Sequence, residues 1–232
     1  MRRAALILAL LALAPQASAQ PPQGAALYAE DCVKCHGAKG VGVPGVGPPL
    51  RGVGAGTADF YLRTGYMPLG SPHEQPYRKR VLFDERQIVS LVRYVASFGS
   101  GPPIPQPHPE HGNVAEGLHL FTEHCAGCHQ VVARGGVVTG ARVPPLTRAS
   151  PVEIAEAVRA GPYVMPAFTK SALSDAQLDS IIRYVEYAKH PSNVGGWGIG
   201  FVGPVPEGMV TWLIAAVALV AICTAIGRRV SG

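Results

Sequence analysis

The sequence predicts an all-α protein with two tandem helical domains followed by one C-terminal transmembrane helix. Three observations lead to this prediction. A pattern of motifs returns after about 93 residues, apolar residues recur at helical spacing in both copies, and a run of uncharged residues lies close to the C-terminus. The low aromatic content of 7% fits small helical domains whose core is partly filled by something other than protein.

Residues 1–19 have the three parts of a secretory signal peptide. Met1 is followed by two arginines, then by the apolar stretch Ala4–Ala14, and then by Ala17-Ser-Ala19. The apolar stretch of about 11 residues is too short to cross a hydrocarbon core of about 30 Å. We therefore expect cleavage after Ala19 and export of the chain.

The pentapeptide Cys-x-x-Cys-His occurs twice, at Cys32–His36 and at Cys125–His129. It is the attachment sequence of c-type heme, in which two thiols bond the porphyrin and the adjacent imidazole faces the iron. A redox dithiol would be expected within a βαβ pattern, and a zinc site would offer further ligands at set spacings. Neither context is present, so we expect two covalently bound hemes c, attached through Cys32, Cys35, Cys125 and Cys128.

Each heme motif is followed at a distance by Met-Pro, at Met67 and at Met165. The chain has four methionines, and the other two are the initiator and Met209 at the start of a hydrophobic run. Six further histidines could replace a methionine as a ligand, although we expect them at the surface. Among them, His124 is the strongest alternative ligand because it adjoins Cys125. The six are His73, His108, His111, His119, His124 and His190.

The repeat divides the exported part into domain 1 at 24–99, a Pro-rich linker at 100–114 and domain 2 at 115–190. The elements return in the same order: a short helix before each heme motif, a Pro-Pro-Leu loop, a helix before each Met-Pro, and a closing helix. Both closing helices start with Asp or Ser in a capping position. They place matching apolar residues on one face: Ile88, Leu91, Val92 and Val95, or Leu178, Ile181, Ile182 and Val185.

The C-terminal part of the sequence has the features of a membrane anchor. A Gly-rich segment at 191–207 contains alternating Trp197, Ile199 and Phe201, which favours docking on a neighbouring membrane subunit. The uncharged run at 208–226 is long enough to span a bilayer as a helix. Two arginines in the tail at 227–232 predict a cytoplasmic C-terminus by the positive-inside rule. We therefore expect a single-pass protein of the cell membrane, with both heme domains on the extracytoplasmic side.

The net charge of +5 does not indicate a nucleic-acid partner. Four of the basic residues lie in the signal peptide and in the tail, so the exported part carries 16 basic and 15 acidic side chains. Heme propionates would make that part mildly acidic. We expect no nucleic acid among the partners.

Each half of the exported part resembles a class I cytochrome c domain, with Cys-x-x-Cys-His early, a Gly-Pro-x-Leu type of loop and a late methionine. The resemblance implies that Pro48 and Pro144 offer their carbonyls to the Nδ1–H groups of His36 and His129, so that Nε2 of each ring binds iron. It also implies that Met67 and Met165 supply sulfur from the opposite side of each heme. The metal ligands would then be His36, Met67, His129 and Met165.

Over nearly the whole mature chain the sequence is similar to the diheme cytochrome cc subunit of actinobacterial cytochrome bc1 complexes. The similarity depends on three stretches: Tyr66-Met-Pro-Leu-Gly, Tyr77-Arg-Lys-Arg, and above all the Gly-rich lead beginning Gly195-Gly-Trp-Gly before the terminal span. Some members carry a longer N-terminal region that can stay as an anchor, so the resemblance leaves the number of spans open at one or two.

The resemblance implies an electron-transfer subunit of a menaquinol:cytochrome c oxidoreductase. The chain would relay electrons from the Rieske iron-sulfur centre to the copper centre of a terminal cytochrome c oxidase, with cytochrome b and the Rieske protein as partners. It would have no catalytic residues of its own. Two alternatives stay open: the diheme subunit of another respiratory oxidase or dehydrogenase, and a diheme peroxidase, which would need an iron with an open position.

Overall fold

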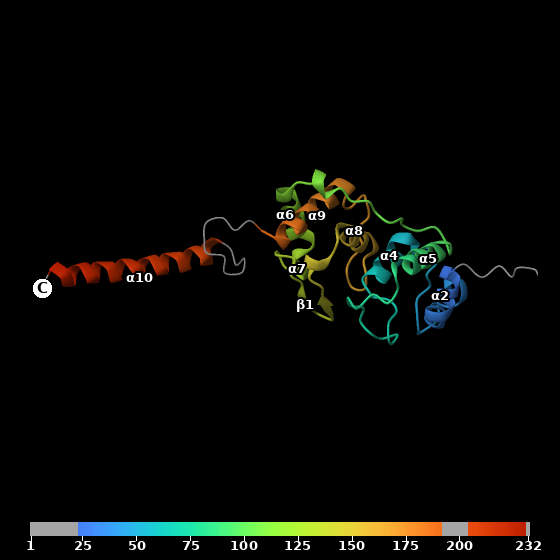
Figure 1. Ribbon diagram of the computed structural model, residues 1–232. Coiled ribbons are helices and arrows are strands. Elements are labelled where there is room, and N and C mark those ends of the chain that lie inside the picture. Colours follow the sequence, from blue (N-terminus) through green and yellow to red (C-terminus); the bar gives the residue numbers. More distant parts are fainter. Residues whose placement is uncertain (1–22, 192–203, 231–232) are drawn as a thin grey trace, which may run out of the picture. The chain divides into compact units, whose positions relative to one another are not determined.

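The computed structural model describes residues 23–191 and 204–230. The predicted signal peptide at 1–19 lies outside the described residues, as does most of the Gly-rich segment at 191–207. The described part is mainly helical, as predicted (Figure 1).

The first copy of the repeat contains α2 (Gln23–Asp31), α3 (Val33–His36), the 3₁₀ turn η1 (Ala38–Gly40), α4 (Gly54–Arg63) and α5 (Glu85–Ala96). The second contains η2 (Pro109–His111), α6 (Val114–His124), α7 (Ala126–His129), η3 (Leu146–Arg148), α8 (Pro151–Ala160) and α9 (Asp175–Lys189). The order of helices is the same in both copies, as the motif order predicts.

A short β-hairpin departs from the all-α prediction. It consists of β1 (Gly136–Val138) and β2 (Ala141–Val143), which pair as a two-stranded sheet. The turn between them contains Gly140 at φ +80°, a conformation that glycine adopts at little cost. The valine-rich sequence on either side of this turn favours strands, and the hairpin leads the chain directly to Pro144.

The described chain forms two compact units that do not follow the repeat. The first unit comprises the chain up to Pro107 together with residues 140–142 and 150–173, and the second comprises residues 108–139, 143–149 and 174 onward. The first unit therefore includes α8, which packs against α4. The domain boundaries 24–99 and 115–190 stay a prediction, because the helix contacts of α8 cross them.

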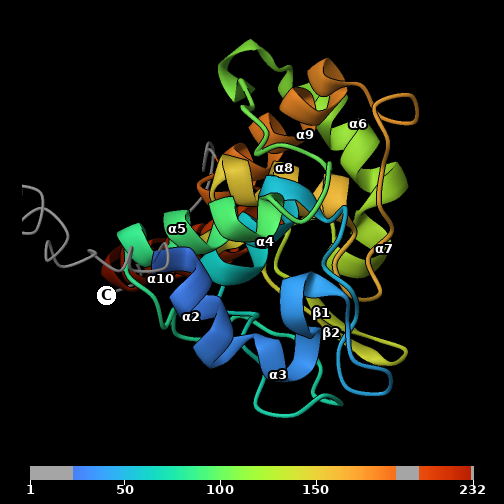
Figure 2. The same cartoon turned by 90° about the vertical axis from the view of Figure 1, so that its right-hand side faces the viewer.

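In the first unit, α5 packs against both α2 and α4, and Figure 2 shows these helices side by side. The predicted face of the closing helix is buried as expected. The core of this unit is formed by Tyr28, Ala58, Leu62, Ile88, Leu91, Val92 and Val95. The α2–α5 crossing is close, because a Cβ atom added to Gly24 would lie 2.1 Å from the carbonyl oxygen of Ser90.

In the second unit, α6 packs against α9 (Figure 1). The predicted face is again buried, with Leu178, Ile181, Ile182 and Val185 all shielded from solvent. The crossing repeats the glycine contact of the first unit, since a Cβ atom on Gly117 would lie 1.9 Å from the carbonyl oxygen of Ser180. The same close helix crossing at a glycine therefore occurs in both copies of the repeat.

Both closing helices begin with the expected cap. Asp84 accepts a hydrogen bond from the Gln87 backbone N–H, and the Gln87 side chain accepts one from the Asp84 backbone N–H. Ser174 and Gln177 make the same pair of bonds at the start of α9. This reciprocal capping box satisfies backbone groups that a helix start leaves free.

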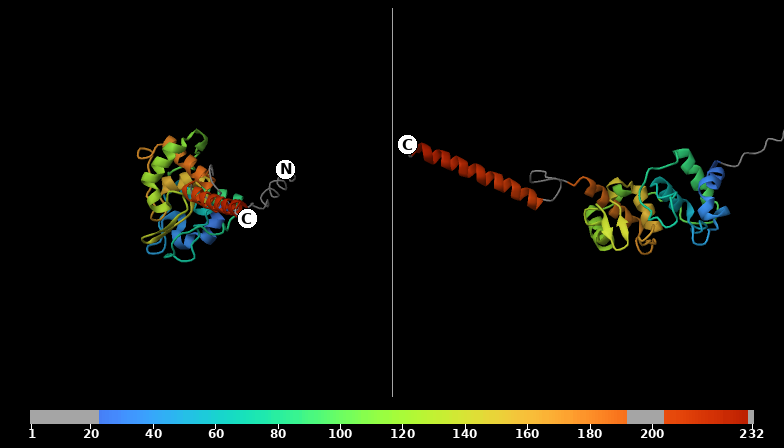
Figure 3. Two further views of the ribbon diagram at one scale, coloured as in Figure 1. Left: turned by 90° about the vertical axis from the view of Figure 1, so that its left-hand side faces the viewer. Right: turned by 90° about the horizontal axis from the view of Figure 1, so that it is seen from below.

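The C-terminal helix α10 (Pro204–Val230) contains the predicted span 208–226. Residues 205–230 form a candidate membrane-spanning helix, in which an 18-residue window has a mean hydropathy of 2.5. The helix is an uninterrupted rod in Figure 3. Its large apolar side chains are exposed, as suits contact with lipid: Trp212, Leu213, Val217 and Leu219 are examples.

Candidate heme sites

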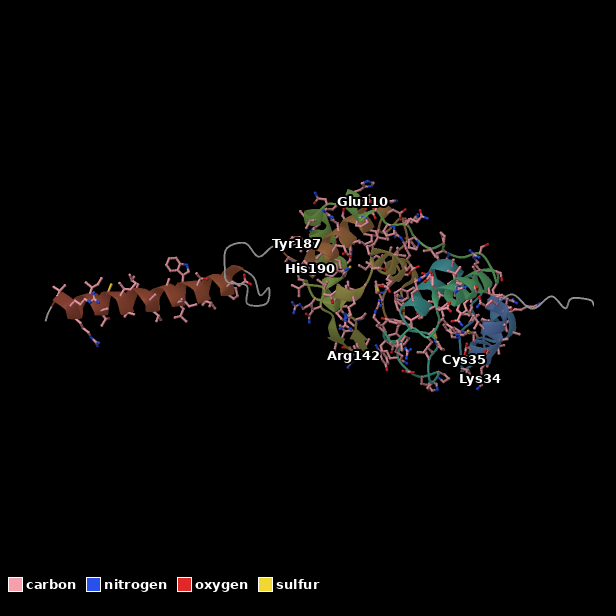
Figure 4. The ribbon with its side chains drawn as sticks, viewed as in Figure 1. Lys34, Cys35, Glu110, Arg142, Tyr187 and His190 are labelled. Atoms are coloured by element: carbon pink, nitrogen blue, oxygen red, sulfur yellow. The ribbon has the colours of Figure 1, made fainter. Side chains whose placement is uncertain are left out.

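The first heme motif forms a single helical turn directly after α2. Cys32 is the N-cap residue of α3, and the N–H groups of Cys35 and His36 both donate to the Cys32 carbonyl, at 3.2 and 2.9 Å. Gly37, at φ +68°, ends the turn after His36. Figure 4 shows Cys35 and Lys34 next to each other on this turn. Local backbone bonds alone therefore bring the two thiols and the imidazole together.

His36 is held from the side by the Pro-Pro-Leu loop. His36 is 8% exposed, and its Nδ1 lies 2.8 Å from the carbonyl oxygen of Pro48. The loop runs directly against the motif, because a Cβ atom on Gly47 would lie 2.4 Å from the Cys35 carbonyl oxygen. A carbonyl oxygen can accept a hydrogen bond but cannot donate one, so Nδ1 carries the proton in this bond, and in the neutral ring the Nε2 lone pair is available.

The second motif repeats this arrangement. Cys125 is the N-cap residue of α7, and His129, also 8% exposed, has Nδ1 at 3.2 Å from the carbonyl oxygen of Pro144. Burial lowers the pKa of His129, and the hydrogen bond to Pro144 raises it by a smaller amount. The neutral ring that results is the form in which imidazole binds a metal. The structure thus contains both His–Pro hydrogen bonds that the resemblance implies.

The cysteines are poorly suited to dithiol chemistry. All four cysteines of the motifs are free thiols, and burial raises the pKa of Cys32 and of Cys125 to about 11. A redox dithiol or a thiolate metal site depends instead on a lowered thiol pKa. The donor set therefore fits c-type heme, which consumes the thiols as thioethers and needs one neutral imidazole at each iron.

The two methionines follow α4 and α8. The Met67 N–H donates to the Tyr61 carbonyl at 3.1 Å, and the Met165 N–H donates to the Pro162 carbonyl at 3.0 Å. Met67 belongs to the same compact unit as His36, whereas Met165 belongs to the first unit and His129 to the second. The pairing of each methionine with its histidine stays a prediction.

The other six histidines are exposed, as expected from the sequence. His124, the residue that adjoins Cys125, has Nε2 at 3.8 Å from a Glu123 carboxylate oxygen. His190, labelled in Figure 4, follows the last residue of α9.

Two tyrosines support the heme motifs and were not among the predicted site residues. The Tyr28 hydroxyl donates to the Gly37 carbonyl at 2.8 Å, and the Tyr184 hydroxyl donates to the Val131 carbonyl at 2.6 Å. Both bonds fix the backbone just after a histidine. The position of Tyr28, one helical turn before Cys32, is the sequence signal that could have indicated its role.

A buried carboxyl group was also not predicted. Glu156 on α8 is 1% exposed, and neither of its carboxyl oxygens has a hydrogen-bond partner among the described residues. Burial and the nearby Asp59 carboxylate raise the pKa of Glu156 to about 8, while the charge of Arg63 opposes this shift. Glu156 is therefore largely protonated at neutral pH.

A comparison with protein families gives a match in both halves of the chain. A family model described as cytochrome c oxidase, cbb3-type, subunit III matches residues 19–95 and 112–185. A cbb3-type cytochrome c oxidase subunit CcoP from Azospirillum is 30% identical, with 75% of this chain and 62% of that protein covered.

Two relatives with higher sequence identity to this chain are cytochrome c subunits of another complex. The cytochrome bc1 complex cytochrome c subunit of Corynebacterium diphtheriae is 36% identical, with 89% of this chain and 80% of that protein covered. Its namesake from Mycobacterium tuberculosis is 37% identical, with 89% and 77% covered. The chain therefore belongs to the family of cytochrome c subunits of the cytochrome bc1 complex.

Proposed function

We propose that this chain transfers electrons within a bc1-type quinol:cytochrome c oxidoreductase through two covalently bound hemes c. Cys32 and Cys35 attach one heme, and Cys125 and Cys128 attach the other. When bound, each heme iron supplies one-electron redox chemistry. The observation that carries the proposal is the pair of buried histidines, each directly after two free cysteines and each hydrogen-bonded to a proline carbonyl.

The protein groups have separate tasks at each iron. The carbonyls of Pro48 and Pro144 orient the rings of His36 and His129 and hold a proton on Nδ1, so that Nε2 is the nitrogen that would bind iron. Met67 and Met165 would each supply a thioether sulfur to a heme iron. His/Met ligation raises the reduction potential of a c-type heme. The burial of both histidines limits water near the iron, which reduces the reorganisation that accompanies each transfer.

The chain acts as a relay rather than as a catalyst. Electrons pass from the Rieske iron-sulfur centre of the same complex to this subunit, and then to the copper centre of a terminal cytochrome c oxidase. Cytochrome b and the Rieske protein are the partners within the complex. The helix α10 anchors the subunit, and Arg228 and Arg229 at its end favour a cytoplasmic C-terminus, with both heme domains outside.

The heme count is tested by a pyridine hemochrome assay combined with the intact mass of the purified chain. We expect two hemes per chain in the wild type and in Cys223→Ser, whose cysteine lies on α10 outside both motifs. The double variants Cys32→Ser/Cys35→Ser and Cys125→Ser/Cys128→Ser should each retain a single heme. One heme in the wild type would overturn the proposal.

The axial ligands are tested by spectroelectrochemistry. Met67→His and Met165→His should each lower one of two reduction potentials and leave both hemes attached, because the thioether bonds do not depend on the sixth ligand. Rapid binding of carbon monoxide to the reduced wild-type protein would instead favour a heme enzyme with an open iron position.

A second candidate function is the diheme subunit of a cbb3-type oxidase, which the family model and the Azospirillum relative favour. Purification of the complex from native membranes separates the two functions. We expect this chain to co-purify with a cytochrome b and a Rieske protein. Its recovery with an oxidase and without those two proteins would support the second function.

A further inference from the structure

Two histidines and one glutamate gather where the Pro-rich linker ends. His108, Glu110 and His111 each offer one ligand atom, and these atoms all lie within 4.8 Å of one another. His108 Nδ1 lies 3.1 Å from Glu110 Oε1, and the two imidazole rings are stacked with centroids 5.7 Å apart. Figure 4 shows Glu110 at the outer edge of the second unit. None of the three residues takes part in the proposed heme sites.

The backbone beneath this cluster is firmly held. The His108 N–H donates to Asp179 Oδ1 on α9 at 2.7 Å, and the His111 N–H donates to the His108 carbonyl at 2.9 Å. The turn η2, which carries Glu110 and His111, packs against α9.

The chain is anchored again directly after the cluster. A Cβ atom on Gly112 would lie 2.5 Å from the Asp179 carbonyl oxygen, and the Asn113 N–H donates to Ser180 Oγ at 3.1 Å. Contacts to α9 therefore fix the backbone on both sides of the cluster. A ligand would need to order only the side chains, which lowers the entropic cost of binding.

The donor set identifies the class of ion. Two imidazoles and one carboxylate suit Zn²⁺ and Cu²⁺, with metal–ligand distances of about 2.0–2.2 Å and ligand atoms about 3.3 Å apart in a tetrahedral site. Exposed side chains can close the remaining gap by rotation. Ca²⁺ and Mg²⁺ prefer shells of oxygen ligands, of which this cluster offers a single carboxylate. Three protein ligands also leave a position for water or for an external ligand.

We propose that His108, Glu110 and His111 form a binding site for one divalent transition-metal ion such as Zn²⁺. The bound ion braces the chain where the linker enters α6, since the ligands precede that helix by only a few residues. The proposal does not depend on the number of hemes or on their redox partners.

Isothermal titration calorimetry with Zn²⁺ tests the site on the full chain with its hemes, purified through a tag without histidine and stripped with a chelator. We expect one Zn²⁺ per chain with micromolar affinity. His108→Gln/His111→Gln should weaken binding by about tenfold or more. The matched control is His119→Gln on α6, an exposed histidine whose Nε2 lies 3.9 Å from a Glu123 oxygen. It should bind Zn²⁺ like the wild type.

Electron paramagnetic resonance with one equivalent of Cu²⁺ gives a second readout, because nitrogen hyperfine coupling reports imidazole ligands directly. We expect this coupling in the wild type and in His119→Gln, and its loss in the double variant. The heme absorbance of every variant should match the wild type, which separates this test from that of the electron-transfer function. Unchanged affinity in the double variant, or an equal loss in His119→Gln, would overturn the proposal.

Discussion

The helices that precede the two methionines, α4 and α8, carry an arginine in the same place but use it differently. Arg63 at the end of α4 bonds Asp59 at 2.7 Å and the two carboxylate oxygens of Glu85 at 2.6 and 2.7 Å. Arg159 in the last turn of α8 donates to the carbonyls of Phe168 and Leu173, at 3.1 and 2.8 Å.

The two helices also each bury an acidic side chain, and the two acids have different surroundings. Asp59 is buried but ion-paired with Arg63, so α4 can hold a carboxylate away from water. Glu156 on α8 is buried without a hydrogen-bond partner in the described part of the chain, and burial raises its pKa to about 8. A buried acid can therefore be held as a carboxylate by an ion pair, as on α4, or in the protonated form, as on α8, where burial and the Asp59 carboxylate raise its pKa.

The largest expected effect is the pH dependence of stability caused by Glu156. The pKa rises from an ordinary value of 4.5 to about 8 on folding, so between these values the folded state binds more protons than the unfolded state. The free energy of unfolding should then fall as the pH rises, by about 1.4 kcal/mol for each pH unit. The stabilisation that Glu156 provides is fully present below pH 4.5 and is lost as the pH rises through about 8.

Thermal denaturation of the full chain between about pH 5 and pH 8 measures this slope. Glu156→Gln should flatten it, because the amide does not titrate. Glu30→Gln is the control, since Glu30 is an exposed glutamate on α2. A wild-type slope that persists in Glu156→Gln would show that other groups are responsible.

The two helix crossings at Gly24 and Gly117 should lose similar stability when the glycine is replaced. Gly24→Ala and Gly117→Ala each push a Cβ atom against the carbonyl of Ser90 or Ser180, and we expect a loss of about 3 kcal/mol in the free energy of unfolding. Chemical denaturation followed by circular dichroism measures it. Gly208→Ala on α10 has open space and should change little. Unequal losses would mean that the two crossings differ in rigidity.

The ion pair on α4 should stabilise the fold. Arg63→Met leaves the buried Asp59 carboxylate without its ion pair, and we expect a loss of about 2 kcal/mol in the free energy of unfolding. Adding Asp59→Asn to Arg63→Met should restore part of the loss in the same denaturation experiment. A double variant as unstable as Arg63→Met would contradict this role of the ion pair.

The smallest effects concern the caps of the closing helices. Asp84→Ala and Ser174→Ala each remove the side-chain acceptor of a capping box, at a cost of about 1 kcal/mol. The midpoint of thermal denaturation should fall by a similar amount in both variants. Ser97→Ala is a fair control, since its hydroxyl bonds the Tyr94 carbonyl at the other end of α5.

Much of the local structure could be predicted because it depends on neighbouring residues. The apolar face of α5, the caps at Asp84 and Ser174, and the membrane-length helix all follow from spacing along the chain. The His–Pro hydrogen bonds were implied by the family resemblance. The β1–β2 hairpin was missed, because the helical context of the repeat outweighed a short valine-rich stretch around Gly140.

The sequence by itself determined the two Cys-x-x-Cys-His turns, the order of the helices and the C-terminal anchor, because covalent chemistry and hydrogen bonds over a few residues control them. Only the tertiary structure decided that α8 packs against α4 and that Glu156 is buried and protonated. It also decided that the side chains of His108, Glu110 and His111 gather beside α9. Helical periodicity gives the face that a helix buries but does not name the helix that will cover it. The partner of each face, and with it the burial of Glu156, depends on contacts between residues far apart in the chain.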